Sequence, residues 1–300
     1  MIKNIVKDPK YGYLRVDPIP SIDEVEKYYK EDFYAESNKF FNDSSLEVQL
    51  NDKDFFDSRW YRYYEVLETF LGNLNKKNIY DIGFGFAQTL LYFKSKGLIC
   101  SGIEPSKEGV DYALKRGING KVGGIENENS YKSESKQDIV MMVNVLEHLR
   151  TPFETLSNIK KNLISENGIL IIDVPNEFND FQLAANKEYD LNDWWIAPPR
   201  HINYFSPSSL KNLLNCSGYE VIKQESSFPM EIFLLFGDVY VGDSDLGSVC
   251  HKKRINFEKV MIKNGFKRKL NAFYESLSEL ELGRQITFYA KPIKDPIKRI

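Results

Sequence analysis

Short apolar runs that alternate with amphipathic segments, starting at Asn78, constrain the fold of this chain most strongly. The runs cover residues 78–82, 99–104, 138–143 and 168–174, and helical patterns lie between them. Strands that alternate with helices predict a mostly parallel sheet, because parallel neighbours need long crossover connections. The last two runs are apolar on both faces, as expected of central strands covered by helices. The sequence therefore predicts an α/β fold.

The segments around these runs predict four regions. They are a helical and aromatic lid (1–75), the sheet with its helices (76–228), an inserted cap (229–281) and a final strand with a tail (282–300). Within the cap, a Gly/Asp/Ser-rich stretch at 237–248 predicts a loop. The stretch around 257–280 predicts one basic amphipathic helix.

Composition excludes several classes of protein. The chain has 300 residues, 42% of them hydrophobic, which is enough for a full core. It has no run of the roughly 18 apolar residues that a membrane-spanning helix needs, so we expect a cytoplasmic location. Three widely spaced cysteines provide neither a disulfide framework nor a zinc site. A formal net charge of -3 disfavours nucleic acid as a partner, and any charged partner must be recognised locally.

The segment 80–87 has the pattern of a tight turn from a strand into a helix. Gly83 and Gly85 permit positive φ and close approach of a ligand to the backbone. Exposed amides at the start of the helix can bind polar or anionic groups. A dinucleotide fingerprint needs a third glycine at position 88, where this chain has Gln88. The turn predicts a cofactor site and disfavours NAD.

This turn resembles motif I of class I S-adenosylmethionine-dependent methyltransferases, which have an acidic residue two positions before the first glycine. Asp81, Gly83, Gly85 and Ala87 match the motif, and Ala87 is a mild departure at the last place. The resemblance covers about residues 78 to 225. It implies a Rossmann-like, seven-stranded, mostly parallel sheet with helices on both faces. It also implies S-adenosylmethionine as cofactor and S-adenosylhomocysteine as product.

Three further residues extend the resemblance to the cofactor site. Glu104 ends the second strand, where an acid can accept hydrogen bonds from both ribose hydroxyls. The segment 138–152 resembles motif IV of ubiquinone-type and related small-molecule methyltransferases, which implies that Asn144 lies beside the methionine moiety. Glu126 falls where family members flank the adenine, although the usual Asp is missing.

Two histidines are the catalytic candidates. Methyl transfer from a sulfonium requires alignment of the acceptor and removal of its proton. His201 lies in a segment that resembles the His-x-x-x-Phe-Ser segment of sugar methyltransferases, where the histidine faces the acceptor. An imidazole that titrates near neutral pH can take the proton. His148 follows Glu147, and three roles are open for it. It is a general base, or it helps to bind a metal, as the matching Glu-His pair is thought to do in ubiquinone-type enzymes. Alternatively, it only holds the loop in place. We predict no metal site.

The residues expected to bind the acceptor lie mostly near position 200. Arg200 is a cation suited to a phosphate or carboxylate, where related sugar C-methyltransferases carry Glu. Trp194 and Trp195 stack on a sugar or nucleobase, or plug the core, and Tyr204 belongs to the same segment. Tyr34 belongs to a leader that resembles that of cell-surface polysaccharide methyltransferases, and it either closes over the donor or is a packing aromatic.

The resemblance and Arg200 together favour O-methylation of a small anionic acceptor, such as a nucleotide sugar or a phosphate-bearing precursor of a cell-surface polysaccharide. Two alternatives remain. One is an NAD(P)-dependent oxidoreductase, which Gln88 disfavours. The other is a non-catalytic domain that binds the donor as a scaffold, since a fold and a cofactor turn do not establish turnover.

Overall fold

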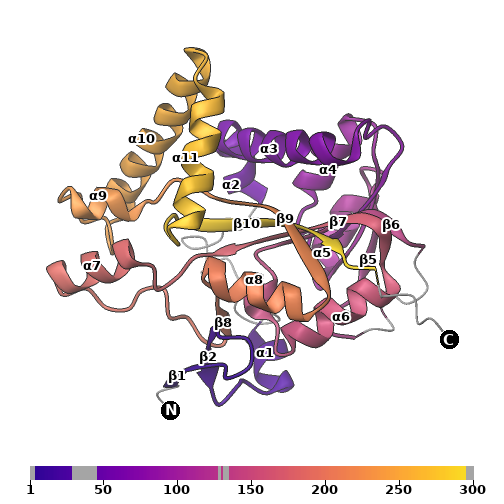
Figure 1. Ribbon diagram of the computed structural model, residues 1–300, viewed down its shortest axis with the longest axis horizontal. Helices are drawn as coiled ribbons and strands as arrows, with labels where there is room; N and C mark the ends of the chain where they lie inside the picture. The colour runs from indigo at the N-terminus through magenta and orange to yellow at the C-terminus, as the bar shows by residue number, and fades with distance from the viewer. Residues whose placement is uncertain (1–3, 29–45, 128–129, 131–134, 295–300) are drawn as a thin grey trace.

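The structure, a computed structural model, describes residues 4–28, 46–127, 130 and 135–294. Figure 1 shows a central sheet between layers of helices. Its seven strands have the order β5-β4-β3-β6-β7-β10-β9, with β10 antiparallel to both of its neighbours and the other pairs parallel. The strands are β3 (Asn78–Ile82), β4 (Ile99–Glu104), β5 (Asn119–Val122), β6 (Gln137–Val143), β7 (Ile164–Pro175), β9 (Tyr219–Ser226) and β10 (Gln285–Pro292). This topology confirms the predicted Rossmann-like fold.

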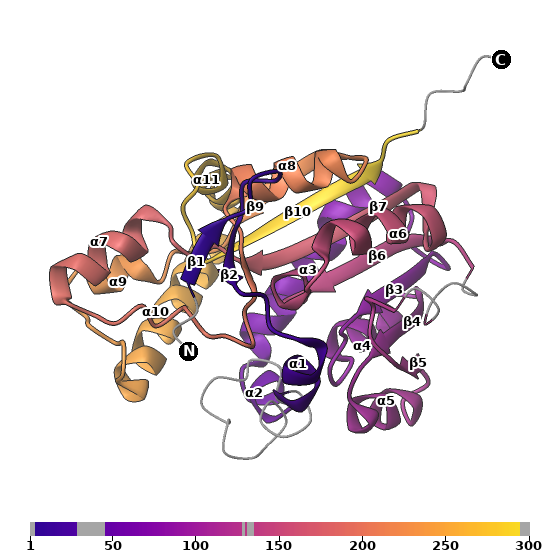
Figure 2. The same ribbon diagram turned by 90° about the horizontal axis from the view of Figure 1, so that it is seen from below.

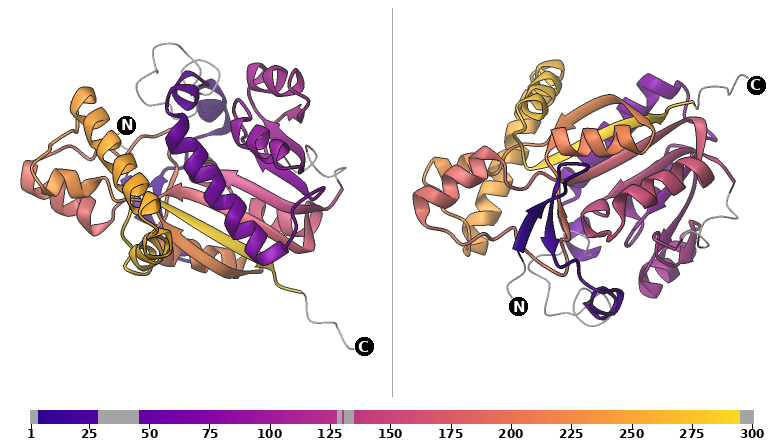
Figure 3. Two further views of the ribbon diagram at one scale, coloured as in Figure 1. Left: turned by 90° about the horizontal axis from the view of Figure 1, so that it is seen from above. Right: turned by 60° about the horizontal axis from the view of Figure 1, so that its bottom comes forward.

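Helices cover both faces of the sheet. On one face lie α3 (Lys53–Leu71), α4 (Gln88–Ser95) and α5 (Lys107–Leu114), and on the other lie α6 (Pro152–Asn162) and α8 (Pro207–Cys216). Figure 3 shows α3 crossing the sheet from above, and Figure 2 shows α6 and α8 from below. Neighbouring residues of a strand point to opposite faces. Ile79 packs on the face that carries α3, α4 and α5, and Tyr80 packs on the face that carries α6 and α8. Within the described residues, no helix is both long and apolar enough to cross a bilayer.

The N-terminal region contains a small sheet that the sequence pattern did not predict. Strands β1 (Asn4–Lys7) and β2 (Leu14–Asp17) form a hairpin, and β2 also pairs with β8 (Asn203–Tyr204). The expectation of helices and loops alone in this region was therefore wrong. The region also contains α1 (Ile22–Tyr28) and α2 (Leu46–Asn51). The pairing of β2 with β8 ties the N-terminus to the segment that carries His201.

The segment between β9 and β10 consists of α9 (Glu231–Leu235), α10 (Ser244–Lys263) and α11 (Lys267–Glu279). The single helix predicted around 257–280 is broken, because Gly265 has φ +81° and ends α10. The predicted loop at 237–248 is shorter than expected. Asp243 caps α10 by accepting hydrogen bonds from the amides of Asp245 and Leu246, so the helix begins inside the polar stretch.

Candidate functional site

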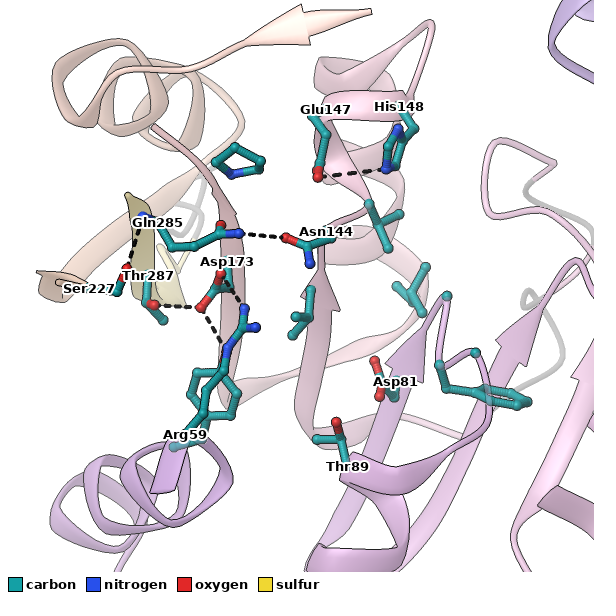
Figure 4. A pocket seen from close by; sticks show the side chains of 18 of the residues that line it. Arg59, Asp81, Thr89, Asn144, Glu147, His148, Asp173, Ser227, Gln285 and Thr287 are labelled. Carbon is teal, nitrogen blue, oxygen red and sulfur yellow. Dashed lines mark hydrogen bonds and ion pairs between the residues drawn. The ribbon is translucent and has the colours of Figure 1, made fainter. Parts of the chain in front are cut away.

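A cavity of about 1450 Å³ lies at the carboxyl ends of the parallel strands. Its wall is built from the ends of β3, β4, β6 and β7, the inner side of α3, the segment 194–201 and parts of α10 and α11. Figure 4 shows side chains from β3, β7, β10 and α3 around this space, together with Asn144, which follows β6. Ligands bind at this edge of open α/β sheets.

The glycine turn after β3 forms one wall of the cavity. Gly83 and Gly85 have φ of +74° and +54°, which disfavours any residue with a side chain. A Cβ on Gly83 would lie 2.6 Å from Val145 Cγ2, whereas a Cβ on Gly85 would meet no protein atom within 4 Å. Gly85 thus leaves space for a ligand at the backbone, as the sequence predicted for a cofactor turn.

Ala87 lies in a different place from the one that its motif position implied. It is completely buried in the core between the sheet, α3 and α4, and it is not part of the cavity wall. Its left-handed φ of +55° at the start of α4 accompanies this inward placement. The structure therefore does not place Ala87 with the other predicted cofactor residues, and its small size serves packing.

The Glu104 carboxylate holds the glycine turn in place through hydrogen bonds to backbone amides. One carboxylate oxygen accepts a hydrogen bond from the Gly85 amide at 2.9 Å, and the other accepts one from the Ser106 amide at 2.8 Å. The side chain is buried and lines the cavity. A carboxylate has about four lone-pair positions, so each of its oxygens can accept more than one hydrogen bond.

Asp81 is a buried acid at the end of β3. It is 3% exposed and lines the cavity, and Figure 4 shows its carboxyl group directed into it. Burial, and secondarily the negative charge of Glu104, raise the pKa of Asp81 to about 8. No ion pair of Asp81 is found among the described residues. A cationic group of a ligand would therefore meet an acid that has no cation of the protein beside it.

Asn144 and Glu126 also line the cavity. Asn144 follows β6 with φ +54°, its amide nitrogen donates to the Asp173 carbonyl at 2.8 Å, and its side-chain amide lies 3.3 Å from that of Gln285. Glu126 is exposed, and one of its oxygens accepts hydrogen bonds from the backbone and hydroxyl of Thr151, each at 2.7 Å. The predicted cofactor residues other than Ala87 thus share one cavity.

His201 and Glu177 form a pair on the cavity wall. Nδ1 of His201 lies 3.1 Å from one Glu177 oxygen and 3.2 Å from the other, and both residues are largely buried. Because a carboxylate accepts hydrogen bonds, it holds the imidazole proton on Nδ1. Nε2 of His201 then carries the lone pair, which is the arrangement of an oriented base.

His148 lies beside His201, with ring centres 5.2 Å apart. Its Nδ1 donates to the Arg200 carbonyl at 2.6 Å, because a carbonyl oxygen only accepts. Burial, and then the neighbouring His201, lower the pKa of His148 to about 3. A ring that is so hard to protonate is a weak base.

Glu147 completes this group. Both of its carboxylate oxygens are buried and lack a hydrogen-bond partner among the described residues, and burial raises its pKa well above the usual value. Glu147, His148 and His201 offer ligand atoms within 4.8 Å of one another, a geometry that could hold a metal ion. The same group could equally receive a polar acceptor, since an unpaired buried carboxyl gains from any donor.

Only some of the residues predicted to bind the acceptor line the cavity. Arg200, Trp194 and Trp195 line the cavity, and the Nε of Arg200 and the indole nitrogen of Trp195 are buried without a hydrogen-bond partner in the described chain. The two indoles meet edge to face, with centres 4.7 Å apart and planes at 82°. Tyr204 is 2% exposed, belongs to β8 of the small sheet and does not line the cavity, so the structure does not place it with the other predicted acceptor residues. Tyr34 lies outside the described residues.

Sequence reasoning missed a polar network around Asp173. One Asp173 oxygen accepts from Arg59 at 2.7 Å, and the other accepts from the hydroxyls of Tyr63 at 2.7 Å and Thr287 at 2.6 Å. This network, visible in Figure 4, fixes α3 to β7 and β10 and forms a wall of the cavity. The available signals were an acid at the end of an apolar strand and the i, i+4 spacing of Arg59 and Tyr63. Glu177, two residues after β7, gave no such signal.

Comparison with solved structures supports the fold. The chain is similar to a SAM dependent methyltransferase from Archaeoglobus fulgidus, with a TM-score of 0.51, 19% identity, and 82% of this chain and 100% of that chain covered. It is also similar to the plantazolicin methyltransferase BamL, which was crystallised with a triazolic desmethylPZN analog and SAH. That match has a TM-score of 0.54, 15% identity, and 90% and 94% of the two chains covered. Among curated proteins, none matches the chain.

A sequence model of the methyltransferase domain family matches residues 56–224, which is more than half of the chain. The matched region begins in α3 and ends in β9, so it contains the glycine turn, Glu104, Asn144 and the histidine pair. The family is one of methyltransferases, and the oxidoreductase and scaffold alternatives lose their basis. The chain therefore belongs to the methyltransferase domain family, as a class I enzyme that uses S-adenosylmethionine.

Proposed function

We propose that this enzyme methylates a hydroxyl oxygen of a small anionic acceptor, such as a nucleotide sugar or a phosphate-bearing precursor of a cell-surface polysaccharide. The observation that carries the proposal is the group formed by Arg200, His201 and Glu147 on one cavity wall. It combines a cation whose buried Nε makes no hydrogen bond in the described chain, an oriented imidazole, and a carboxyl whose oxygens make none either. A cation suits the anionic part of the acceptor, and the imidazole suits its hydroxyl proton.

The donor is proposed to occupy the wall formed by β3 and β4. Glu104 would accept the ribose hydroxyls, Asp81 the cationic amino group of the methionine moiety, and Glu126 would flank the adenine. The space at Gly85, which a Cβ would fill, and the raised pKa of Asp81 support this fit. Asn144 would lie beside the methionine moiety. The bound donor supplies an electrophilic methyl group on a sulfonium, so the protein contributes alignment and proton removal.

The size of the cavity supports a second ligand. Its volume of about 1450 Å³ exceeds the range of roughly 300–1,000 Å³ that is usual for a site of one small molecule. Tyr240, Arg254 and Leu270 from the 229–281 segment line its far part. We therefore infer that the acceptor enters between this cap and the sheet.

The polar groups around the second part of the cavity favour a hydroxyl-bearing acceptor. Arg200 Nε and Trp195 Nε1 offer donors, Glu147 offers acceptors, and the buried hydroxyl of Tyr240 offers both. None of these atoms makes a hydrogen bond within the described chain. A sugar hydroxyl both donates and accepts, so a polyol satisfies such a mixed set better than an apolar ligand would. The edge-to-face indoles give the same region an apolar surface.

Proton removal is assigned to His201. Nδ1 is held by Glu177, so Nε2 can accept the hydroxyl proton while the carboxylate stabilises the imidazolium that results. General-base assistance of this kind is worth about 10² to 10⁴ in rate. His148 orients Arg200 through the backbone carbonyl of that residue and stays neutral.

The test is methyl transfer from labelled S-adenosylmethionine to matched pairs of acceptors, one phosphorylated and one not, with the product identified by mass spectrometry. We expect methyl ethers of phosphorylated sugars, and a KM for the acceptor at least about tenfold higher in Arg200→Gln with the donor affinity unchanged. Arg116→Gln, at an exposed position outside the cavity wall, is the matched control. Turnover of neutral or amine acceptors only, or an unchanged KM in Arg200→Gln, would contradict the proposal.

A further inference from the structure

The turn between α10 and α11 combines exposed apolar side chains with positive charge. Residues 260–273 contain four cations, Lys263, Lys267, Arg268 and Lys269, and no acidic residue. In the same stretch Phe266 is 54% exposed and Ile262 is 43% exposed. Figure 1 shows α10 and α11 as an antiparallel pair that rises from the sheet, with this turn at its far end. We call residues 260–273 the hairpin end.

The five basic residues of 259–269, in the helix pair α10 and α11, divide into two groups. Lys259 and Lys267 face the body of the protein, where they form ion pairs with Asp54 and Glu65 of α3. Lys263, Arg268 and Lys269 are exposed and form no ion pair with any residue that the structure describes. The first group attaches the hairpin to α3, and the second group remains available to a partner.

We propose that the hairpin end docks the enzyme on an anionic lipid surface. Basic residues near such a surface are attracted by its negative potential, and apolar side chains between them can enter the boundary between headgroups and acyl chains. The protein as a whole has a formal charge of -3, so the attraction must come from this local cluster. The exposed apolar side chains of Phe266 and Ile262 favour lipid over nucleic acid, because contacts to nucleic-acid phosphates need no inserted apolar side chain.

The hairpin end also touches the cavity. Ile262, Lys267 and Leu270 line its cap side, so one helix pair carries both the docking residues and part of the cavity wall. A docked enzyme would hold this part of the cavity close to the lipid headgroups. The arrangement fits an acceptor that is itself carried by a lipid, but binding to the surface requires no acceptor and is measured without one.

The experiment is co-sedimentation of the whole protein with vesicles of phosphatidylcholine alone and of phosphatidylcholine with phosphatidylglycerol, at low and high salt. Each basic residue near an anionic surface changes the partition coefficient about fivefold, so K263Q/R268Q/K269Q should bind on the order of 100-fold more weakly. Phe266→Ser should bind about tenfold more weakly. The matched control is K115Q/K187Q/K211Q, which removes three exposed lysines that lie outside the cap and form no ion pair with described residues.

Selective binding to the anionic vesicles, weakened by salt and by the hairpin variants but not by the control, is the expected result. Circular dichroism and S-adenosylhomocysteine affinity should be unchanged in every variant, which separates docking from folding and from the donor site. Equal weakening by the control variant, equal binding to neutral vesicles, or binding to duplex DNA in the absence of binding to vesicles would each overturn the proposal. Failure of the acceptor assay would leave it unaffected.

Discussion

Replacement of Asp81 by Asn should stabilise the protein in the absence of donor while it weakens donor binding. The Asp81 carboxyl is 3% exposed, and burial together with Glu104 raises its pKa from 3.8 to about 8. A raised carboxyl pKa contributes stability at pH values below the unfolded value, and this stability is lost as pH rises through the folded value. Wild-type protein therefore loses stability from this group between about pH 4 and pH 8.

The size of the effect follows from the shift. Each pKa unit corresponds to about 1.4 kcal/mol, so the loss reaches about 4 kcal/mol at pH 7 and about 6 kcal/mol above pH 8, as an upper bound. Asn has nearly the shape of the neutral acid and does not titrate. The free energies of unfolding of wild type and Asp81→Asn should be similar at pH 4 and should diverge above it, with the variant more stable.

Urea denaturation of both proteins between pH 4 and pH 8.5 measures this divergence, and the comparison cancels all other titrating groups. Donor binding gives the second half of the prediction. If a cationic amino group pairs with Asp81, binding at pH 6.5 should release up to about one proton in wild type and none in Asp81→Asn. Calorimetry in buffers of different ionisation enthalpy detects the proton. A difference in stability that does not vary with pH, or equal donor affinity in the two proteins, would refute the reasoning.

Four further outcomes are expected. Glu104→Gln should weaken binding of S-adenosylhomocysteine by about 10- to 100-fold in a calorimetric titration, because it loses a charged acceptor of the Gly85 and Ser106 amides. His201→Asn should lower kcat by about 10² to 10⁴ in the methyl-transfer assay and leave donor affinity within about twofold. Glu177→Gln should lower kcat less and shift the pH-rate profile, since it changes what holds Nδ1 of His201. Incubation with EDTA should leave kcat unchanged, because a sulfonium donor is already activated; a loss that Mg²⁺ or Zn²⁺ restores would instead assign Glu147 and both histidines to a metal.

The sequence predicted the sheet and the tight glycine turn because both depend on local patterns. Apolar runs bounded by turns identify buried strands, and a pair of glycines after the first strand identifies the place where backbone meets ligand. The two hydrogen bonds of Glu104 follow from the same geometry, since the ends of parallel neighbours β3 and β4 lie side by side. A motif position does not fix the direction in which a side chain points. Ala87 matches the motif, yet its side chain lies in the core.

Tyr204 shows the same limit on the acceptor side. It lies three residues after His201, and its hydroxyl donates a hydrogen bond to the His201 carbonyl at 3.3 Å instead of reaching the cavity. The His201 side chain faces the cavity, and Tyr204 packs with Val16 and Trp195 under the small sheet. That sheet depends on the pairing of Leu14 with Tyr204 and of Arg15 with Asn203, contacts between residues almost 190 positions apart that no local pattern reveals. In the cap, by contrast, Asn264 and Gly265 were a readable stop signal for α10.

The charged residues of the cavity fall into two groups, and the division predicts what each substitution changes. Arg59 is paired with Asp173, Arg62 with Glu225 and Arg284 with Glu231. Removal of one partner leaves a buried charge behind, so substitutions in this group should reduce stability first and affect both ligands together. Asp81 and Arg200 form no ion pair with described residues, and Glu147 lies 3.6 Å from Nε2 of His148, a ring that its lowered pKa keeps neutral. Their burial costs free energy in the empty protein, and a ligand of opposite or complementary character recovers it, so substitutions in this second group should change the binding of one ligand without loss of stability.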